Sequence, residues 1–444
     1  MLWIASFVCF LSAAYHFYIN RGRLVTVGGV VSLLWGIVNM INAISPFDWY
    51  PLNDQCKIVI LVGSFAIVVG LFTTRQMPCV QLNNNKNNEN LDFNEIYKIF
   101  FYLQAILIVV MIPVVLKSLR ILMSNNFSMT LLRNIYVSGG EGGSYMSTLE
   151  RLFYIHYIVG PSSMACIIID SILFFRHELW KKPLIFIVLL SLLPTIYSAA
   201  RTHIFFAAIS IAIAYFQYKG RTTNNNDIKR VKRKLGIVFL VLVAFMVVIT
   251  MLRGNKSNGV IGYVFKTLVS YFCGGTRVLN RALESPALFG LDDYSYGYCT
   301  IAGLFSIINL INTYIFGRVG LNLLPIEFAS KMNVQTYLAN NVQIGLVSSL
   351  NAFSTMFYYF LRDGVIVFLI IVVIISGRLL TRYEKRSATN GSLKNSFTYI
   401  LFFYTAIMSV CWWEPARTEF WMILIWGRLL CRWLEKRKVV KTRR

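Results

Sequence analysis

Long apolar runs separated by short polar connections cover most of this 444-residue chain. A helix of roughly 17–25 apolar residues crosses the hydrocarbon layer of a bilayer. The runs are continuous, whereas a membrane β-barrel would show short segments of alternating hydrophobicity. We therefore expect an all-α polytopic integral membrane protein with about eleven transmembrane helices, over residues 2–20, 24–45, 58–74, 97–116, 152–174, 183–200, 202–218, 235–252, 364–377, 397–412 and 418–434.

The basic connections predict the orientation, because Lys and Arg collect in cytoplasmic loops. Residues 219–236 hold seven Lys or Arg, residues 377–395 hold five, and the tail after Gly427 holds eight. Eleven spans make all three cytoplasmic, with a periplasmic N-terminus and a cytoplasmic C-terminus. The connections at 21–23, 81–90 and 175–182 then fall on the cytoplasmic side as well.

Two sizeable segments face outward in this topology, Lys117 to Arg151 and Arg253 to Asp363. The second is too long for a structureless loop in a compact protein, so it should be ordered and functional. Its apolar stretch at 297–317 is interrupted by polar residues, which indicates a re-entrant or interfacial helix; an additional pair of spans is the alternative.

The chain therefore divides into three predicted regions. Residues 1–252 form an N-terminal transmembrane bundle of about eight spans. Residues 253–363 form a large periplasmic loop with amphipathic or re-entrant helices, and residues 364–444 form the C-terminal spans and a basic cytoplasmic tail.

Composition agrees with a membrane protein, at 57% hydrophobic and 14% charged residues. The net charge of +24 does not indicate nucleic-acid binding, because the basic runs lie between spans.

The first apolar run lacks the basic leader of a signal peptide, and we interpret it as a retained span. Cys273 and Cys299 could both face an oxidising compartment and pair.

Arginines on the outward side are exceptions to the rule that basic residues collect in cytoplasmic loops. Arginine binds phosphate bidentately and stays charged when partly buried. Several arginines at one membrane face would form an anion site for a phospholipid head group or a lipid-linked diphosphate. The ten outward arginines are Arg120, Arg133, Arg151, Arg201, Arg253, Arg277, Arg281, Arg318, Arg362 and Arg417.

A structural interpretation of these arginines stays open. Arg201 could pair with Glu414 or Glu419 and bind helices together, and Arg277 and Arg281 could form the solvated face of a surface helix. His203, like His156, is either a satisfied interfacial side chain or a general base.

The outward acids could supply a base or bind a sugar. Glu284, Asp292 and Asp293 lie in "ESPALFGLDDYSYG", where acids and tyrosines such as Tyr294 together suit a glycan surface. No motif indicates a metal or an organic cofactor, and we expect neither.

Three stretches carry a resemblance to a known family: "YSAARTHIFF" (197–206), "YFCGGTRVLNRALES" (271–285) and "NAFSTMFYYFLRDGVIVFLIIVVIISG" (351–377). Together they resemble the Wzy-type O-antigen polymerases, the oligosaccharide repeat-unit polymerases of bacterial surface polysaccharides. The resemblance covers roughly residues 190 to 380.

The resemblance implies a metal-independent glycosyltransferase at the periplasmic face of the bacterial inner membrane. Such enzymes transfer a growing glycan from one undecaprenyl-diphosphate carrier to a second lipid-linked repeat unit, in lipopolysaccharide or related biosynthesis. Arg201 would bind the diphosphate, and Arg277 and Arg281 would approach from the large loop. Membrane lipid and a chain-length regulator would be further partners.

The base stays open between Glu284 and Asp292, or the reaction needs none. The set of candidate catalytic residues is Arg201, Arg277, Glu284 and Asp292, and the candidate diphosphate- or glycan-binding residues are Arg201, His203, Arg253, Arg281, Arg417, Asp293 and Tyr294. A lipid-linked oligosaccharide flippase is the alternative function. A ligase or acyltransferase is a third, although the related ligases use an outward-loop histidine that residues 253–363 lack.

Overall fold

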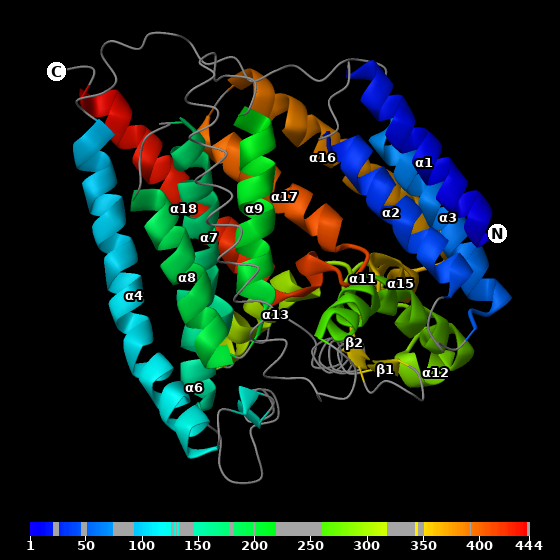
Figure 1. The fold of residues 1–444 in the computed structure, drawn as a ribbon, viewed down its shortest axis with the longest axis horizontal. Helices are drawn as coiled ribbons and strands as arrows, with labels where there is room; N and C mark the ends of the chain where they lie inside the picture. The colour runs from blue at the N-terminus through cyan, green and yellow to red at the C-terminus, as the bar shows by residue number, and fades with distance from the viewer. Residues whose placement is uncertain are drawn as a thin grey trace. The chain divides into compact units, whose positions relative to one another are not determined.

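The computed structural model describes residues 1–20, 26–45, 51–73, 93–125, 128–129, 131–132, 146–176, 182–198, 200–218, 260–317, 342–344, 350–390 and 392–441. These residues are helical apart from turns and one pair of short antiparallel strands (Figure 1). The chain forms two compact units, each assembled from segments far apart in the sequence. Unit 1 comprises Met1–Met77, Phe265–Lys385 and Thr405–Trp421; unit 2 comprises Pro78–Val264, Arg386–Tyr404 and Met422–Arg444.

The prediction of a helical protein with several membrane-spanning segments is confirmed. Among the described residues, six helical segments are long and apolar enough to cross a membrane: Leu2–Ile19, Val27–Ile44, Asp54–Leu71, Tyr97–Ser124, Leu149–Phe175 and Ile366–Thr389. Two shorter apolar helices, Pro183–Ser198 and Thr202–Tyr218, coincide with further predicted spans. The predicted span 235–252 lies outside the described residues.

Unit 1 contains the first three helices and most elements of the segment predicted to face outward. Its elements are α1 (Leu2–Ile19), α2 (Val27–Ile44), α3 (Asp54–Leu71), most of α11 (Val260–Glu284), α12 (Pro286–Phe289), α13 (Ala302–Ile311), the π-helix η3 (Asn312–Phe316), β1 (Val342–Ile344), β2 (Leu350–Ala352), α15 (Met356–Asp363), most of α16 (Ile366–Asn390) and the 3₁₀ helix η5 (Glu414–Ala416).

Unit 2 is a bundle of apolar helices. Its elements are α4 (Phe93–Ser124), α6 (Thr148–Arg151), the π-helix η1 (Leu152–Tyr157), α7 (Val159–Arg176), α8 (Lys182–Ser198), α9 (Thr202–Tyr218), most of α17 (Leu393–Met408) and most of α18 (Thr418–Lys441). Within it, α7 packs against α8 and α9, and α4 packs mainly against α8.

The helices α1, α2 and α3 lie side by side (Figure 1). Buried polar side chains lie between them, and large apolar side chains are exposed outside. Ser12 and Ser32 share a hydrogen bond of 3.0 Å, and Asn39 donates to Ser64 at 3.0 Å; all four side chains are buried. Polar side chains inside a membrane bundle are expected to face one another in this way.

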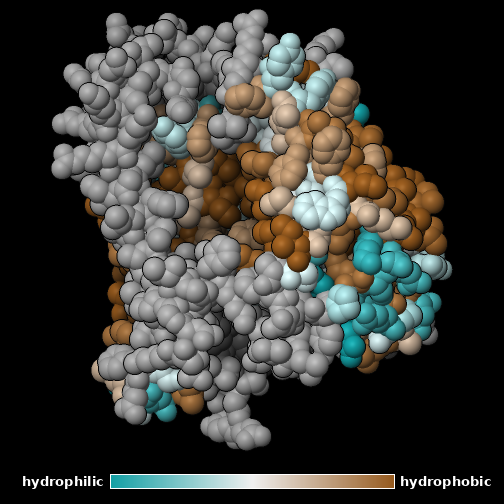
Figure 2. Space-filling model, turned by 45° about the vertical axis from the view of Figure 1, so that its right-hand side comes forward, coloured by the Kyte–Doolittle hydropathy of each residue, from teal (hydrophilic) through white to brown (hydrophobic). Residues whose placement is uncertain are grey.

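The outer surface of unit 1 suits contact with lipid. Figure 2 shows apolar side chains over the side that carries these helices, with a hydrophilic patch below them. The α1 side chains of Trp3, Phe7 and Leu11 are all exposed. Large exposed apolar areas are rare on soluble monomers, so this surface supports membrane insertion.

A close approach of two glycines joins α3 to α16. A Cβ atom added at Gly377 would lie 2.7 Å from the carbonyl carbon of Gly70, which is too close for any larger residue. Small residues at such crossings let membrane helices pack tightly. The crossing lies within α16, which continues to Asn390, whereas the sequence had predicted the span to end at Gly377.

The two ends of α2 contact different parts of unit 1. At its N-terminus, the buried Glu384 of α16 accepts a hydrogen bond from the Val27 amide at 3.1 Å. After its C-terminus, Ser45 contacts Arg277 of α11. Because α2 is about 27 Å long, the segment 377–385 and the C-terminal half of α11 lie at opposite ends of this bundle.

Helix boundaries differ from the sequence predictions for local reasons. The side chain of Asn53 caps α3 by accepting from the Cys56 amide at 2.7 Å, so α3 begins at Asp54 and not at residue 58. The predicted helix at 297–317 is shorter, because residues 297–301 form turns and α13 begins at Ala302.

Candidate functional site

The C-terminal half of α11 carries a polar face that contacts the connection between α2 and α3. Residues three and four apart share a helix face, which brings Thr276, Asn280 and Glu284 into one row. The Thr276 hydroxyl donates to Asn42 Oδ1 at 2.8 Å. Arg277 Nη2 donates to Ser45 Oγ at 3.3 Å. This part of α11 is therefore held against the bundle by Asn42 of α2 and by Ser45, directly after α2.

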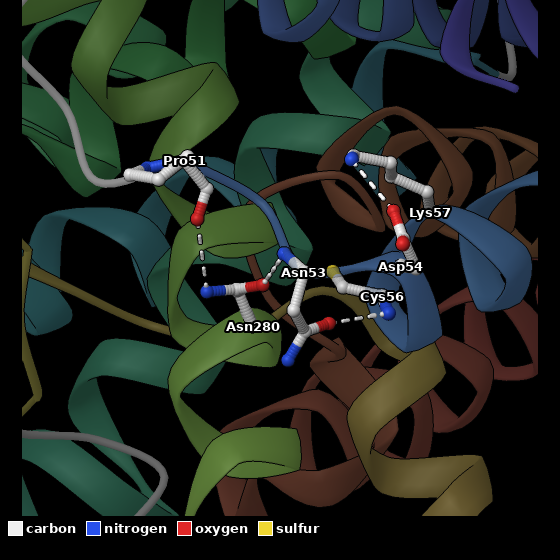
Figure 3. Close-up of polar contacts among 6 residues, drawn as sticks. All are labelled: Pro51, Asn53, Asp54, Cys56, Lys57 and Asn280. Carbon is white, nitrogen blue, oxygen red and sulfur yellow. Dashed lines mark hydrogen bonds and ion pairs between the residues drawn. The ribbon is translucent and has the colours of Figure 1, made fainter.

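Asn280 makes the closest link between α11 and α3 (Figure 3). Its Oδ1 accepts from the Asn53 amide at 2.7 Å, and its Nδ2 lies 3.4 Å from the Pro51 carbonyl oxygen. The same Nδ2 donates to Glu284 Oε1 at 2.7 Å. One amide side chain therefore satisfies backbone groups before α3 and orients a candidate catalytic carboxylate.

Arg277 and Arg281 differ in exposure although both lie on α11. Arg277 is only 6% exposed, and burial lowers the pKa of its guanidinium to about 10, so it stays charged at neutral pH. The side chain of Arg281 is 61% exposed. The two arginines therefore do not form one solvated helix face, because Arg277 is buried and only Arg281 is exposed.

Glu284 lies where a catalytic base could operate. Its side chain is 38% exposed, Oε1 accepts from Asn280, and Oε2 lies 3.7 Å from Arg281 Nη1. An exposed pair of this length is weak. Solvent or a ligand can therefore compete for both groups.

The segment after Gly290 is held in place by the end of α15. The buried carboxylate of Asp363 accepts three hydrogen bonds: from Ser295 Oγ at 2.5 Å, the Cys299 amide at 2.7 Å and the Thr300 amide at 2.6 Å. Ser295 also donates its amide to the Arg362 carbonyl oxygen at 2.9 Å. Asp363 thus fully engages both oxygens in ordering this segment.

The candidate base Asp292 and the predicted glycan-binding residues Asp293 and Tyr294 directly precede Ser295, the first residue bonded to Asp363. Asp292, Asp293 and Tyr294 are all exposed, and the Tyr294 side chain is 38% exposed. Gly290 has a φ of 66°, and its Cα lies directly against the Arg362 guanidinium, where a Cβ would fall 2.4 Å from Cζ. The acidic and aromatic side chains therefore project from a segment that Arg362 and Asp363 hold at both ends.

Arg417 has carboxylate partners of its own. Its Nη1 lies 3.9 Å from Glu414 and its Nη2 lies 3.5 Å from Glu419. Its guanidinium carbon is 6.0 Å from the ring centre of Trp412, whose indole N–H donates to Glu414 at 2.5 Å. Glu414 and Glu419, the acids suggested as partners of Arg201, therefore lie beside Arg417.

Arg201 and His203 belong to unit 2, whereas the residues above belong to unit 1. Arg201 lies in the turn between α8 and α9, and its carbonyl oxygen accepts the Phe205 amide at 3.1 Å. Both side chains are half-buried. Arg253 lies outside the described residues.

The possible disulfide between Cys273 and Cys299 is absent, since both are buried free thiols. Burial raises the pKa of the Cys273 thiol to about 12, which makes it a poor nucleophile. Within the described parts of the chain, no three metal-ligating side chains gather into a cluster.

Searches for related proteins returned no matching family model, no matching curated protein and no matching solved structure. The resemblance to O-antigen polymerases therefore stays a prediction from short motifs.

The sequence patterns did not indicate two residues that order this region, Asn280 and Asp363. Asn280 lies between two arginines and carries no charge, so only the contact with Asn53 shows its importance. Asp363 occurs directly before Gly364, where α15 ends, and this Asp-Gly pair was its only signal in the sequence.

Proposed function

We propose that this chain is a membrane glycosyltransferase that polymerises undecaprenyl-diphosphate-linked oligosaccharide repeat units. One observation carries the proposal: α11 presents the buried Arg277, the exposed Arg281 and the half-exposed Glu284 at one end of the α2–α3 bundle. Accessible positive charge beside a carboxylate suits a lipid diphosphate that leaves while a hydroxyl is deprotonated.

The role proposed for each residue follows from the exposure of its side chain. Arg281 binds the diphosphate because its guanidinium reaches solvent. Arg277 is a positioning residue that adds positive charge from its buried place one turn earlier on α11. The exposed Asp292, Asp293 and Tyr294 bind the acceptor glycan through hydroxyl hydrogen bonds and ring stacking. Arg201 remains a separate candidate ligand of the diphosphate, on the strength of the family resemblance alone.

The proposed reaction is a single substitution at the anomeric carbon of the donor glycan. The acceptor hydroxyl oxygen forms the new glycosidic bond, and its proton passes to Glu284 or Asp292. The bond between the anomeric carbon and the diphosphate oxygen breaks, and the electron pair leaves with the diphosphate. Positive charge from Arg281 stabilises that leaving group as it forms.

The test uses the purified full-length protein in lipid vesicles, supplied with lipid-linked repeat units extracted from cells that lack this chain. Wild-type protein should produce a ladder of extended glycans on a gel. Arg281→Ala should reduce the initial rate roughly ten- to hundredfold, as expected for a lost charged contact. The matched control is Lys57→Ala, which removes a surface cation paired with Asp54 at the same end of α3 (Figure 3).

Unchanged ladders from Arg281→Ala would refute the assignment of Arg281. The absence of any ladder from wild-type protein, together with movement of the lipid-linked units across the bilayer, would instead support the flippase. One observation favours that second function, since Asp170 is a fully buried acid inside the candidate span Leu149–Phe175. Acids at such positions are typical of transport pathways.

Orientation is part of the proposal. A reporter that is active only in the periplasm should be active when fused after Ser295 and silent when fused after Asn225. The reverse result would place α11 on the cytoplasmic side and remove the site from the periplasmic face.

A further inference from the structure

A polar pair lies inside the helical bundle of unit 2. Gln104 of α4 donates from Nε2 to Oδ1 of Asp170 on α7 at 3.0 Å. Both side chains are 0% exposed, and both belong to candidate membrane spans. A carboxyl group at such a position needs a specific stabilising partner, because an ionised group inside a membrane is costly.

The remaining oxygens of this pair are incompletely bonded. Over the described residues, neither Asp170 Oδ2 nor Gln104 Oε1 has a hydrogen-bond partner. Both atoms are acceptors when Asp170 is ionised, so they cannot bond to each other. If Asp170 is a neutral acid, its hydroxyl can donate to Gln104 Oε1, and the two groups form a closed ring of two hydrogen bonds.

We propose that Asp170 and Gln104 form an intramembrane proton-binding site, in which one proton held between Asp170 Oδ2 and Gln104 Oε1 joins α7 to α4. The proton satisfies both unpartnered acceptors and removes the buried charge. Loss of the proton leaves a carboxylate beside an amide oxygen in a dry interior, which separates the two helices. This site is independent of the proposed glycosyl transfer.

The surroundings favour a proton over a metal ion. A sodium or calcium ion needs several oxygen ligands, whereas nearby hydroxyls such as Ser163 and Ser171 donate to their own helix backbone. Cys166 on the same helix and Cys431 of α18 are buried thiols. Further titratable side chains on α4, α8 and α9 include the basic Lys98, Lys117, Arg120 and His203 and the phenols of Tyr97, Tyr102, Tyr197, Tyr215 and Tyr218.

Infrared spectroscopy of the purified full-length protein at neutral pH tests the protonation state. The spectrum of wild type minus Asp170→Asn should contain the C=O band of a carboxylic acid, which moves to lower frequency in heavy water. Gln104→Leu should move the same band to higher frequency, because the acid loses its hydrogen-bond partner. A difference spectrum with carboxylate bands in place of the acid band would overturn the proposal.

A second measurement uses thermal stability across pH, with Asp170→Asn as the matched variant. The asparagine Nδ2 supplies permanently the donor that the proton supplies in wild type. Wild type should lose several degrees of melting midpoint when the pH rises far enough to ionise Asp170, and Asp170→Asn should not. Equal pH dependence of the two proteins, or stabilisation of wild type alone by sodium chloride over choline chloride, would contradict a proton site.

Discussion

The side chain of Asn280 bonds the backbone amide of Asn53, 227 residues earlier in the chain, at 2.7 Å (Figure 3). This contact sets the start of α3 against the polar face of α11. It also fixes the amide group that orients Glu284. Glu284, the proposed catalytic carboxylate, is therefore positioned by Asn280, a neutral residue that takes no part in the proposed reaction.

Replacement of Asn280 by Ala should destabilise unit 1. The Asn53 amide and the Pro51 carbonyl oxygen lose a partner, which costs about 1–3 kcal/mol. The thermal midpoint of the full-length protein in detergent should fall, and polymerisation should fall with it. Arg281→Ala is the matched comparison on the same helix, where stability should hold while activity is lost. Equal midpoints for wild type and Asn280→Ala would show that the link to α3 contributes nothing.

Asp363→Asn should loosen the segment that carries the predicted glycan-binding residues. The new amide group places a donor against the N–H groups of Cys299 or Thr300, which leaves at least one of them unsatisfied and costs about 1–3 kcal/mol. Proteolytic cleavage between residues 285 and 301 should become faster, as followed by mass spectrometry. Asp293→Asn, an exposed acid in the same segment, should leave the cleavage rate unchanged. Comparable cleavage of all three proteins would argue against the clamp.

Gly377→Leu should disrupt the crossing of α3 and α16. The side chain has no space beside Gly70, and overpacking of this kind costs typically about 1–3 kcal/mol. The variant should show a lower melting midpoint and reduced yield from membranes. Gly317→Ala is the control, because its Cβ would meet nothing closer than 3.4 Å. A wild-type midpoint for Gly377→Leu would mean that the helices can separate freely at this point.

Arg201→Ala should leave expression unchanged but stop chain extension, so that cells display only single repeat units on their lipid core. The reason is the diphosphate-binding role that the family resemblance implies for Arg201. A silver-stained gel of the surface glycan provides the measurement, with His203→Ala as the neighbouring comparison. Normal long-chain ladders from Arg201→Ala would remove Arg201 from the site.

Much of the fold could be predicted because a membrane helix depends on local composition. A continuous apolar run buries no backbone polar group in lipid when it is helical. That rule correctly placed helices over residues 2–20, 24–45 and 152–174, for example, without any knowledge of their neighbours. Helix ends were less accurate, since a cap such as that of Asn53 is a contact between particular groups.

The candidate site could be predicted only in part. The charge pattern of the sequence predicted a set of outward-facing arginines, and that prediction of orientation needs no tertiary structure. It could not distinguish Arg277 from Arg281, because burial is a property of the packed helix face. It also could not show that Glu414 and Glu419 pair with Arg417.

The sequence by itself determined that the chain is a multi-span helical membrane protein, since hydrophobicity over some twenty consecutive residues is sufficient for insertion. Only the tertiary structure decided which polar groups meet. Asn280 and Asn53, Asp363 and Thr300, and Asp170 and Gln104 are each 63 or more residues apart. Such pairs form because a buried polar group must find a partner wherever packing provides one, and no local pattern in the sequence records that choice.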